Sequence, residues 1–147
     1  MDYKLSDATI HVKATQKGDD EYTDCIEFFT AGSFYHKNGS HYIRYTEQGD
    51  GMEKVNTTVK VEGDKRVTVM RHGAQRYEIV LTKGERQHGF YNTGYGDLML
   101  GISGTKIHSE LSEKGGSLRL EYMLDINNVL VSKNTLEINV KEIKTES

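Results

Sequence analysis

Arg71 is the residue whose type and position most clearly point to chemistry. It follows Val67 and Val69, which alternate with polar residues, so a period of two places Arg71 on the apolar face of a strand. A guanidinium on that face needs an anionic or carbonyl partner, and its planar fork fits a carboxylate. Arg71 is therefore a candidate for binding a ligand carboxylate. The alternative is that Arg71 reaches water at a strand end or pairs with Glu53 or Glu78.

Two predicted hairpins give Arg71 its neighbours. A turn at Gly63-Asp64-Lys65 pairs the predicted strand at residues 55–61 with the strand that contains Arg71. A turn at Gly73-Ala74-Gln75 pairs the Arg71 strand with the predicted strand at residues 76–82. Keeping the apolar residues on one face then sets the register. This register predicts that Thr57, Arg71 and Tyr77 lie side by side on the inward face, which makes all three candidate ligand-binding residues.

His36 and His41 flank Asn38-Gly39, the strongest short signal for a type I′ hairpin turn. That turn places the two imidazoles opposite each other, where a pair can share a metal ion or titrate near pH 6.5. A structural zinc site needs four ligands, and no Cys or acidic residue has the required spacing. We therefore predict no metal site here and interpret the pair as an exposed polar hairpin tip.

His88 is the fourth candidate ligand-binding residue. Hairpin pairing near Leu100, with Phe90 opposite Leu98, predicts that His88 faces inward. The sequence has no Gly-x-Ser-x-Gly, His-Glu-x-x-His, phosphate-loop or dinucleotide-binding motif, so we predict no catalytic residues and no cofactor. Cys25 is interpreted as a small hydrophobic residue or a surface thiol.

The elements that must position these residues are short strands. Alternation of apolar and polar residues covers most of the 147-residue chain, and turn residues rich in Gly, Asn and Asp separate the runs. About ten strands at hairpin spacing predict one antiparallel meander and a single domain over residues 1–147. The alternation is clearest at residues 55–61, 66–69, 76–82, 118–126 and 130–141, and less regular at 8–14, 26–36, 41–46, 86–91 and 96–111.

A meander with one apolar face and no covering helix hides that face by closing into a barrel or splitting into a sandwich. Closure also removes edge strands, which matters in a chain without Pro. The apolar parity shifts around Gly101 and Gly104, so we predict a bulge or barrel corner there. For the last hairpin, a three-residue turn through Val129 pairs Ile126 with Leu130 and Leu120 with Leu136.

Composition excludes several functional classes. The chain has 19 basic and 22 acidic residues, a formal charge of −3 and one Cys. It lacks the basic footprint of a nucleic-acid-binding protein, the paired Cys of a disulfide framework and the roughly 18-residue apolar run of a membrane helix. No signal peptide is recognisable at Met1. We expect a cytoplasmic protein without a nucleic-acid or membrane partner.

Several stretches resemble the YwiB-like family of small bacterial proteins. They are Ile26-Glu27-Phe28, Val69-Met70-Arg71-His72-Gly73, the run 89–98 (GFYNTGYGDL), the run 115–122 (GGSLRLEY) and the run 124–128 (LDINN). The resemblance implies a calycin-type, lipocalin-like antiparallel barrel of 8–10 strands. It brings no established catalytic or binding residues. This chain has Thr93-Gly94-Tyr95-Gly96 where relatives are expected to have Thr-Pro-Tyr-Gly, so the turn is expected to be looser.

The resemblance also supports a hypothesis about function. In calycin barrels an inward Arg together with a Tyr can hold a ligand carboxylate. We therefore expect a small amphipathic or carboxylate-bearing ligand inside the barrel, contacted by Arg71, Tyr77, Thr57 and His88. The alternative is a non-enzymatic protein-interaction module with a solid-packed barrel. An enzyme, with His88, Arg71 and several of the nine Tyr meeting at a barrel mouth, is the least favoured class.

Overall fold

The chain folds into a closed antiparallel barrel of ten strands, which confirms the predicted all-β meander. The computed structural model describes residues 6–18, 23–48, 54–73, 76–92 and 96–143. Each strand pairs with its neighbours in sequence, and β1 closes the barrel against β10. The strands are β1 (Ser6–Gly18), β2 (Thr23–Lys37), β3 (Ser40–Gln48), β4 (Lys54–Glu62), β5 (Arg66–His72), β6 (Tyr77–Thr82), β7 (Arg86–Asn92), β8 (Asp97–Ser112), β9 (Gly115–Ile126) and β10 (Val129–Glu142).

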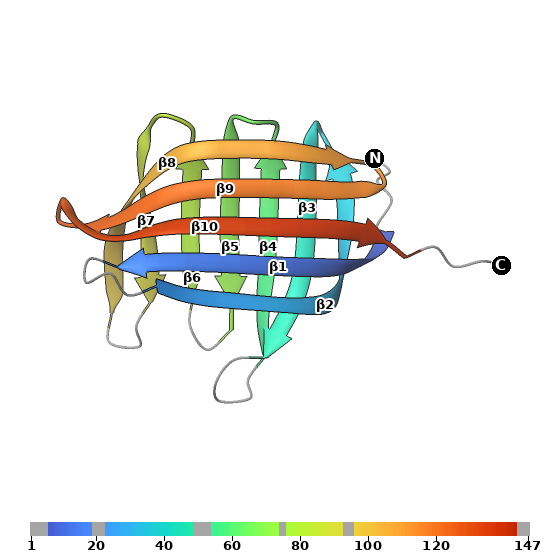
Figure 1. Cartoon of the computed structure of the whole chain (residues 1–147), viewed down its shortest axis with the longest axis horizontal. Helices are drawn as coiled ribbons and strands as arrows, with labels where there is room; N and C mark the ends of the chain where they lie inside the picture. Colours follow the sequence, from blue (N-terminus) through green and yellow to red (C-terminus); the bar gives the residue numbers. More distant parts are fainter. Residues whose placement is uncertain (1–5, 19–22, 49–53, 74–75, 93–95, 144–147) are drawn as a thin grey trace.

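The barrel is flattened into two layers whose strands cross. β1, β2 and β8–β10 form one layer, and β3–β7 run across it in the other (Figure 1). Two long strands belong to both layers and form the corners. β2 pairs with β1 over residues 23–34 and with β3 over residues 32–37, while β8 pairs with β7 over 97–103 and with β9 over 101–112.

Glycines lie where these long strands turn between layers. At Gly32, a Cβ would collide with the main-chain carbonyl of Arg44 and lie 2.8 Å from Ile10 Cγ1, so only glycine fits. In β8 the register shifts between Gly104 and Lys106. This shift confirms the bulge predicted around Gly101 and Gly104.

The hairpins around the candidate site have the predicted registers. Asn38 and Gly39 have φ values of 53° and 81°, as a type I′ turn requires, and His36 pairs with His41. In the next hairpins Thr57 pairs with Arg71 and Arg71 pairs with Tyr77. Of the other turn residues predicted, 74–75 and Gly94 lie outside the described residues.

The β9–β10 hairpin differs from the prediction at its turn. Asn127 and Asn128 have φ values of 54° and 66° and form a two-residue turn that pairs Ile126 with Val129, so the three-residue turn is wrong. The predicted pairing of Leu120 with Leu136 is nevertheless confirmed. The reason is a bulge between Leu130 and Ser132, whose extra residue returns the apolar side chains to the inner face.

The predicted register of β7 and β8 is wrong by one residue. His88 pairs with Gly101, not near Leu100, and Phe90 pairs with Met99, so His88 is exposed on the outer face. Gly89 takes the inward position instead. A Cβ at Gly89 would lie 2.7 Å from Ile102 Cδ1. The core therefore leaves no space for an inward side chain at this point of β7.

The barrel interior is packed at one end and accessible at the other. The packed end carries the short turns that join β2 to β3, β4 to β5, β6 to β7 and β8 to β9. Inward side chains towards it are removed from solvent, with exposed fractions of 0–1% for Ile10, Ile43, Val59, Val61, Val67, Leu81, Ile102, Leu118, Leu120 and Ile138. Towards the other end, where β1, β3 and β5 finish (Figure 1), the exposed fraction of inward side chains rises.

No described segment forms a helix with the length and hydrophobicity of a membrane span.

Candidate functional site

The accessible end, here called the mouth, brings together three of the four predicted ligand-binding residues. Thr57, Arg71 and Tyr77 are direct partners across β4, β5 and β6, as the sequence predicts. The structure adds Tyr45 of β3, which pairs with Thr57 and is buried. The polar wall of the mouth is therefore one row of side chains across four adjacent strands.

Arg71 is held by a carboxylate that sequence reasoning did not identify. Its Nη2 donates a hydrogen bond of 2.5 Å to Glu47 Oε1. Glu47 lies two residues after Tyr45 and hence on the same inward face. The predicted alternative partner Glu78 is wrong, because it pairs with Met70 and faces outward, and Glu53 lies outside the described residues.

One buried polar atom of this row, Arg71 Nε, has no hydrogen-bond partner among the described residues, whereas the side chain of Thr57 is hydrogen-bonded with Tyr45. An unsatisfied buried donor or acceptor costs roughly 1–3 kcal/mol, so such groups need an explanation. The Arg71 side chain as a whole is 41% exposed, against 24% for Glu47. The guanidinium thus combines unused hydrogen-bonding capacity with access from the mouth.

Three tyrosines supply neutral hydroxyl groups beside Arg71. Burial, with a further contribution from Glu47, raises the pKa of Tyr45 to about 12. Burial also raises the pKa of Tyr77 and of Tyr122, whose hydroxyls are hydrogen-bonded to each other. Because Tyr77 comes from β6 and Tyr122 from β9, this bond links the two layers at the inner limit of the mouth. All three phenols remain protonated near neutral pH.

The opposite wall of the mouth is apolar. Ile26 of β2 has the same inward parity as Phe28 and is 56% exposed, and Phe28 packs with its ring centroid 6.0 Å from that of Tyr45. Leu124 and Ile126 of β9 are half-buried and pack against the core. The mouth therefore has a polar wall on β3–β6 and an apolar wall on β2 and β9, which is the surface an amphipathic molecule needs.

His88 does not join this site. On the outer face, Arg86 makes two hydrogen bonds to Asp125, of 3.0 Å from Nε and 2.7 Å from Nη2, and its Nη1 lies 3.5 Å from His88 Nε2. The hydrogen bonds from Arg86 lower the pKa of Asp125. The Arg86–Asp125 ion pair crosses β8 above Gly101, and a side chain at residue 101 would collide with both partners. His88 and Arg71 thus lie on opposite faces of the sheet. The hypothesis of an enzymatic site at the mouth required the two side chains to lie together.

His36 and His41 lie at the packed end of the barrel. Their ring centroids are 4.7 Å apart, and the rings are tilted by 44°. His36 is exposed as predicted, but His41 is half-buried, because its position in β3 faces inward next to Val61 of β4. Burial, and then the neighbouring His36, lower the pKa of His41, while Glu113 opposes them.

This shift makes stability depend on pH. Since the pKa of folded His41 is below its unfolded value of 6.5, the unfolded chain binds more protons as pH falls, and stability is lost as pH drops through about 6.5. We expect His41→Gln to reduce this loss. Urea unfolding at pH 7.5 and 5.5 measures it, with His108→Gln as the control for an exposed histidine. An equal loss in His41→Gln and the wild type would contradict the assignment.

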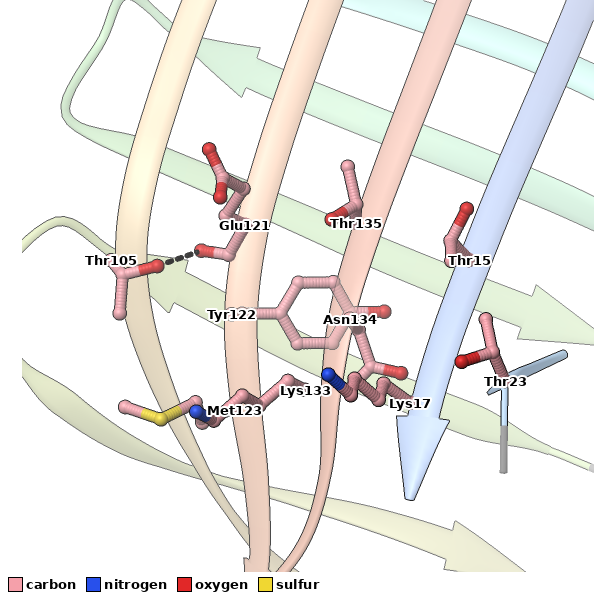
Figure 2. Close-up of a pocket in the computed structure, with 10 residues that line it drawn as sticks. All are labelled: Thr15, Lys17, Thr23, Thr105, Glu121, Tyr122, Met123, Lys133, Asn134 and Thr135. Atoms are coloured by element: carbon pink, nitrogen blue, oxygen red, sulfur yellow. Dashed lines mark hydrogen bonds between the residues drawn. The ribbon is translucent and has the colours of Figure 1, made fainter. Parts of the chain in front are cut away.

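Two surface clefts were not foreseen from the sequence. A cleft of about 400 Å³ lies on the layer formed by β1, β2 and β8–β10, with Lys17 directly opposite Lys133 on one rim (Figure 2). A smaller cleft of about 200 Å³ covers the β2 corner and reaches Tyr45 and Thr57. Both are lined by residues from several strands, which no local pattern brings together. The larger is lined by Thr15, Lys17, Thr23, Thr105, Glu121, Tyr122, Met123, Lys133, Asn134 and Thr135.

Comparisons with known proteins agree on the family. Residues 10–138 match the model of a "Domain of unknown function (DUF1934)". The chain is 36% identical over 119 residues to the "Uncharacterized beta-barrel protein YwiB" of Bacillus subtilis (strain 168), covering 80% of this chain and 81% of that protein. It also matches the crystal structure of the ywiB protein from Bacillus subtilis with a TM-score of 0.83 and 31% identity, over 97% of this chain and 96% of that one. The sequence, the closed barrel and these matches together show that the chain belongs to the YwiB-like (DUF1934) family of β-barrel proteins.

Proposed function

We propose that the protein binds a small amphipathic or carboxylate-bearing ligand at the mouth of the barrel. The observation that carries this proposal is Arg71: an inward guanidinium, accessible from the mouth, whose buried Nε has no partner among the described residues. The inward side chains of the packed half are out of reach of solvent, so this end offers no entry for a ligand. We therefore propose the mouth as the binding position, which is narrower than the barrel interior expected from the sequence.

In the proposed complex the ligand carboxylate binds the guanidinium and the tail covers the apolar wall. One carboxylate oxygen accepts from Arg71 Nε, and the other accepts from Nη2, which Glu47 now occupies. The Thr57 hydroxyl accepts from the Tyr45 hydroxyl and donates its own proton to the same carboxylate. An aliphatic tail against Ile26 and Leu124 gains roughly 0.8 kcal/mol for each buried methylene. Glu47 thus acts as an internal competitor that the ligand displaces.

Laurate is a suitable probe, with dodecanol as its matched uncharged analogue. We expect laurate below its micellar concentration to raise the Tm of the wild type by about 5 °C or more when in large excess over Kd. Arg71→Met should weaken laurate binding by about tenfold to hundredfold, because charge-assisted hydrogen bonds are lost. Glu47→Gln should bind laurate more tightly than the wild type, because the competing carboxylate is gone.

The control is Arg66→Met, which removes a guanidinium from the outer face of the same strand at the packed end. Circular dichroism verifies the fold of each variant. Because Arg71→Met leaves Glu47 without its partner, the double variant Glu47→Gln/Arg71→Met serves as the second test. If laurate stabilises Arg71→Met and Arg66→Met equally, or fails to stabilise the wild type, the proposal is wrong.

A second candidate function is a protein-interaction module with a solid barrel. It is favoured by the fully buried core and by an exposed aromatic side chain on the outer face, Phe29, which is 72% exposed and stacks on His11. The two functions predict different results with laurate. Absence of any stabilisation by laurate, together with absence of a co-purifying small molecule in native mass spectrometry, would favour the second.

Two further properties, the barrel type and the cellular location, are inferred together with this function. We infer that the barrel is calycin-like, since an up-and-down meander closed between its first and last strands is the topology expected from that resemblance. We also infer a cytoplasmic location, supported by a single exposed cysteine and a formal charge of only −3.

A further inference from the structure

We propose that His36 and His41 form a chelating site for a divalent transition-metal ion such as Zn²⁺ or Ni²⁺ at the packed end of the barrel. This site is separate from the mouth, since His36 lies near the end of β2 and His41 near the start of β3, both at the packed end, whereas Tyr45 lies further along β3 towards the mouth. The sequence predicted no metal here because a closed four-ligand site was lacking. The structure points to an open site, in which the protein supplies two nitrogens and water completes the coordination.

The backbone places the two imidazoles directly opposite each other. His36 and His41 are direct partners one position beyond the Lys37–Ser40 pair that closes the type I′ turn. They therefore occupy a pair without mutual main-chain hydrogen bonds, where opposing side chains are closest. Two imidazole nitrogens on one tetrahedral zinc lie roughly 3.3 Å apart, from metal–nitrogen bonds of about 2.0–2.1 Å. The centroid separation of 4.7 Å is compatible with that bite.

The two rings have no competing partner among the described residues. His11 is hydrogen-bonded to Glu27 at 2.7 Å, and His108 is 3.2 Å from Glu110, whereas the rings of His36 and His41 contact each other and neither has a hydrogen bond to a carboxylate among the described residues. Nδ1 of His41 is buried and unpartnered. An ion would therefore reach His41 through Nε2, and neutral imidazole is a good ligand for zinc and nickel.

Charge around the pair also suits a cation. Glu113, on the turn between β8 and β9, is close enough to interact electrostatically with His41. No group of three or more His, Cys, Asp or Glu within the described part of the chain is arranged to hold a metal. Glu113 is accordingly assigned a contribution through its charge or through a bound water, and not direct ligation. The proposed site has two protein ligands.

The test is a titration of the full-length, tag-free chain with ZnCl₂ and NiCl₂ by isothermal calorimetry. We expect one ion per chain, and an affinity that falls by about tenfold or more in His36→Gln and in His41→Gln. His108→Gln, which removes an exposed histidine from β8, is the matched control and should bind as the wild type does. Affinity should also be lower at acidic pH than at neutral pH, because protons compete with the ion for the imidazole nitrogens.

A readout that needs no variant is the imidazole spectrum of the wild type. On addition of Zn²⁺, the ring resonances of His36 and His41 should shift together and saturate at one equivalent, while those of His108 stay unchanged. The proposal is overturned if the His36→Gln/His41→Gln double variant binds either ion as tightly as the wild type. It is equally overturned if the two rings show no common response to Zn²⁺.

Discussion

Replacing Gly32 with Ala is expected to destabilise the barrel by about 3 kcal/mol and to lower its Tm by about 10 °C. Gly32 is the residue of β2 that pairs with β1 through Ala8 and with β3 through Tyr45, so it joins the two layers. An added methyl would collide with the main-chain carbonyl of Arg44, and a backbone carbonyl moves only if its strand moves. Thermal unfolding followed by circular dichroism measures the effect.

Gly101→Ala is the matched control for this prediction. Gly101 is the corresponding corner residue of β8, but the atoms nearest to an added Cβ there are the flexible ends of Arg86 and Asp125. These side chains can rotate away, so the loss of stability should be clearly smaller than at Gly32. Equal Tm values for the two variants would mean that the close approach at Gly32 does not limit how the layers join.

Leu120→Ala is the second substitution with a large expected effect, a loss of about 2–5 kcal/mol from the free energy of unfolding. Leu120 is fully buried in β9 between Leu136 of β10 and Ile107 of β8. Its truncation leaves a cavity that a packed barrel cannot close. Urea unfolding measures the loss as a shift in midpoint at constant slope.

Ile26→Ala is the comparison that tests the difference in burial between the packed half of the barrel and the mouth. Ile26 also faces inward, but it lies at the mouth and is 56% exposed, so its truncation should change stability by about 0.5 kcal/mol or less. It should instead weaken laurate binding, because Ile26 belongs to the apolar wall. Similar stability losses for Leu120→Ala and Ile26→Ala would contradict the division into a packed half and an accessible mouth.

The candidate site was predictable where it depends on neighbouring hairpins. Thr57, Arg71 and Tyr77 follow from short turns and from valines that must face inward, and both signals are local. The same is true of His36 opposite His41, which the Asn38-Gly39 turn dictates. In these segments a one-residue error would have moved every valine to the solvent face, so the pattern admits a single register.

Prediction was wrong where the apolar pattern is weak. Residues 86–90 contain no β-branched side chain, and placing either His88 or Gly89 inward is compatible with alternation. The packing of Ile102 against Gly89 decides between them, and that contact comes from another strand. The predicted length of the β9–β10 turn was wrong for a different reason. A two-residue turn followed by a bulge after Leu130 gives the same alternation of apolar residues as a three-residue turn, so alternation alone does not distinguish them.

The sequence by itself determined the strands, most hairpin registers and the inward direction of Arg71, because these follow from residue types close together in the chain. Only the tertiary structure decided that Glu47 holds Arg71, that Tyr77 meets Tyr122 across the layers, and that β1 closes on β10. These contacts join residues 24, 45 and more than 100 positions apart. They depend on how far the sheet twists and bends at Gly32 and Gly104, a property of all ten strands together and not of any local segment.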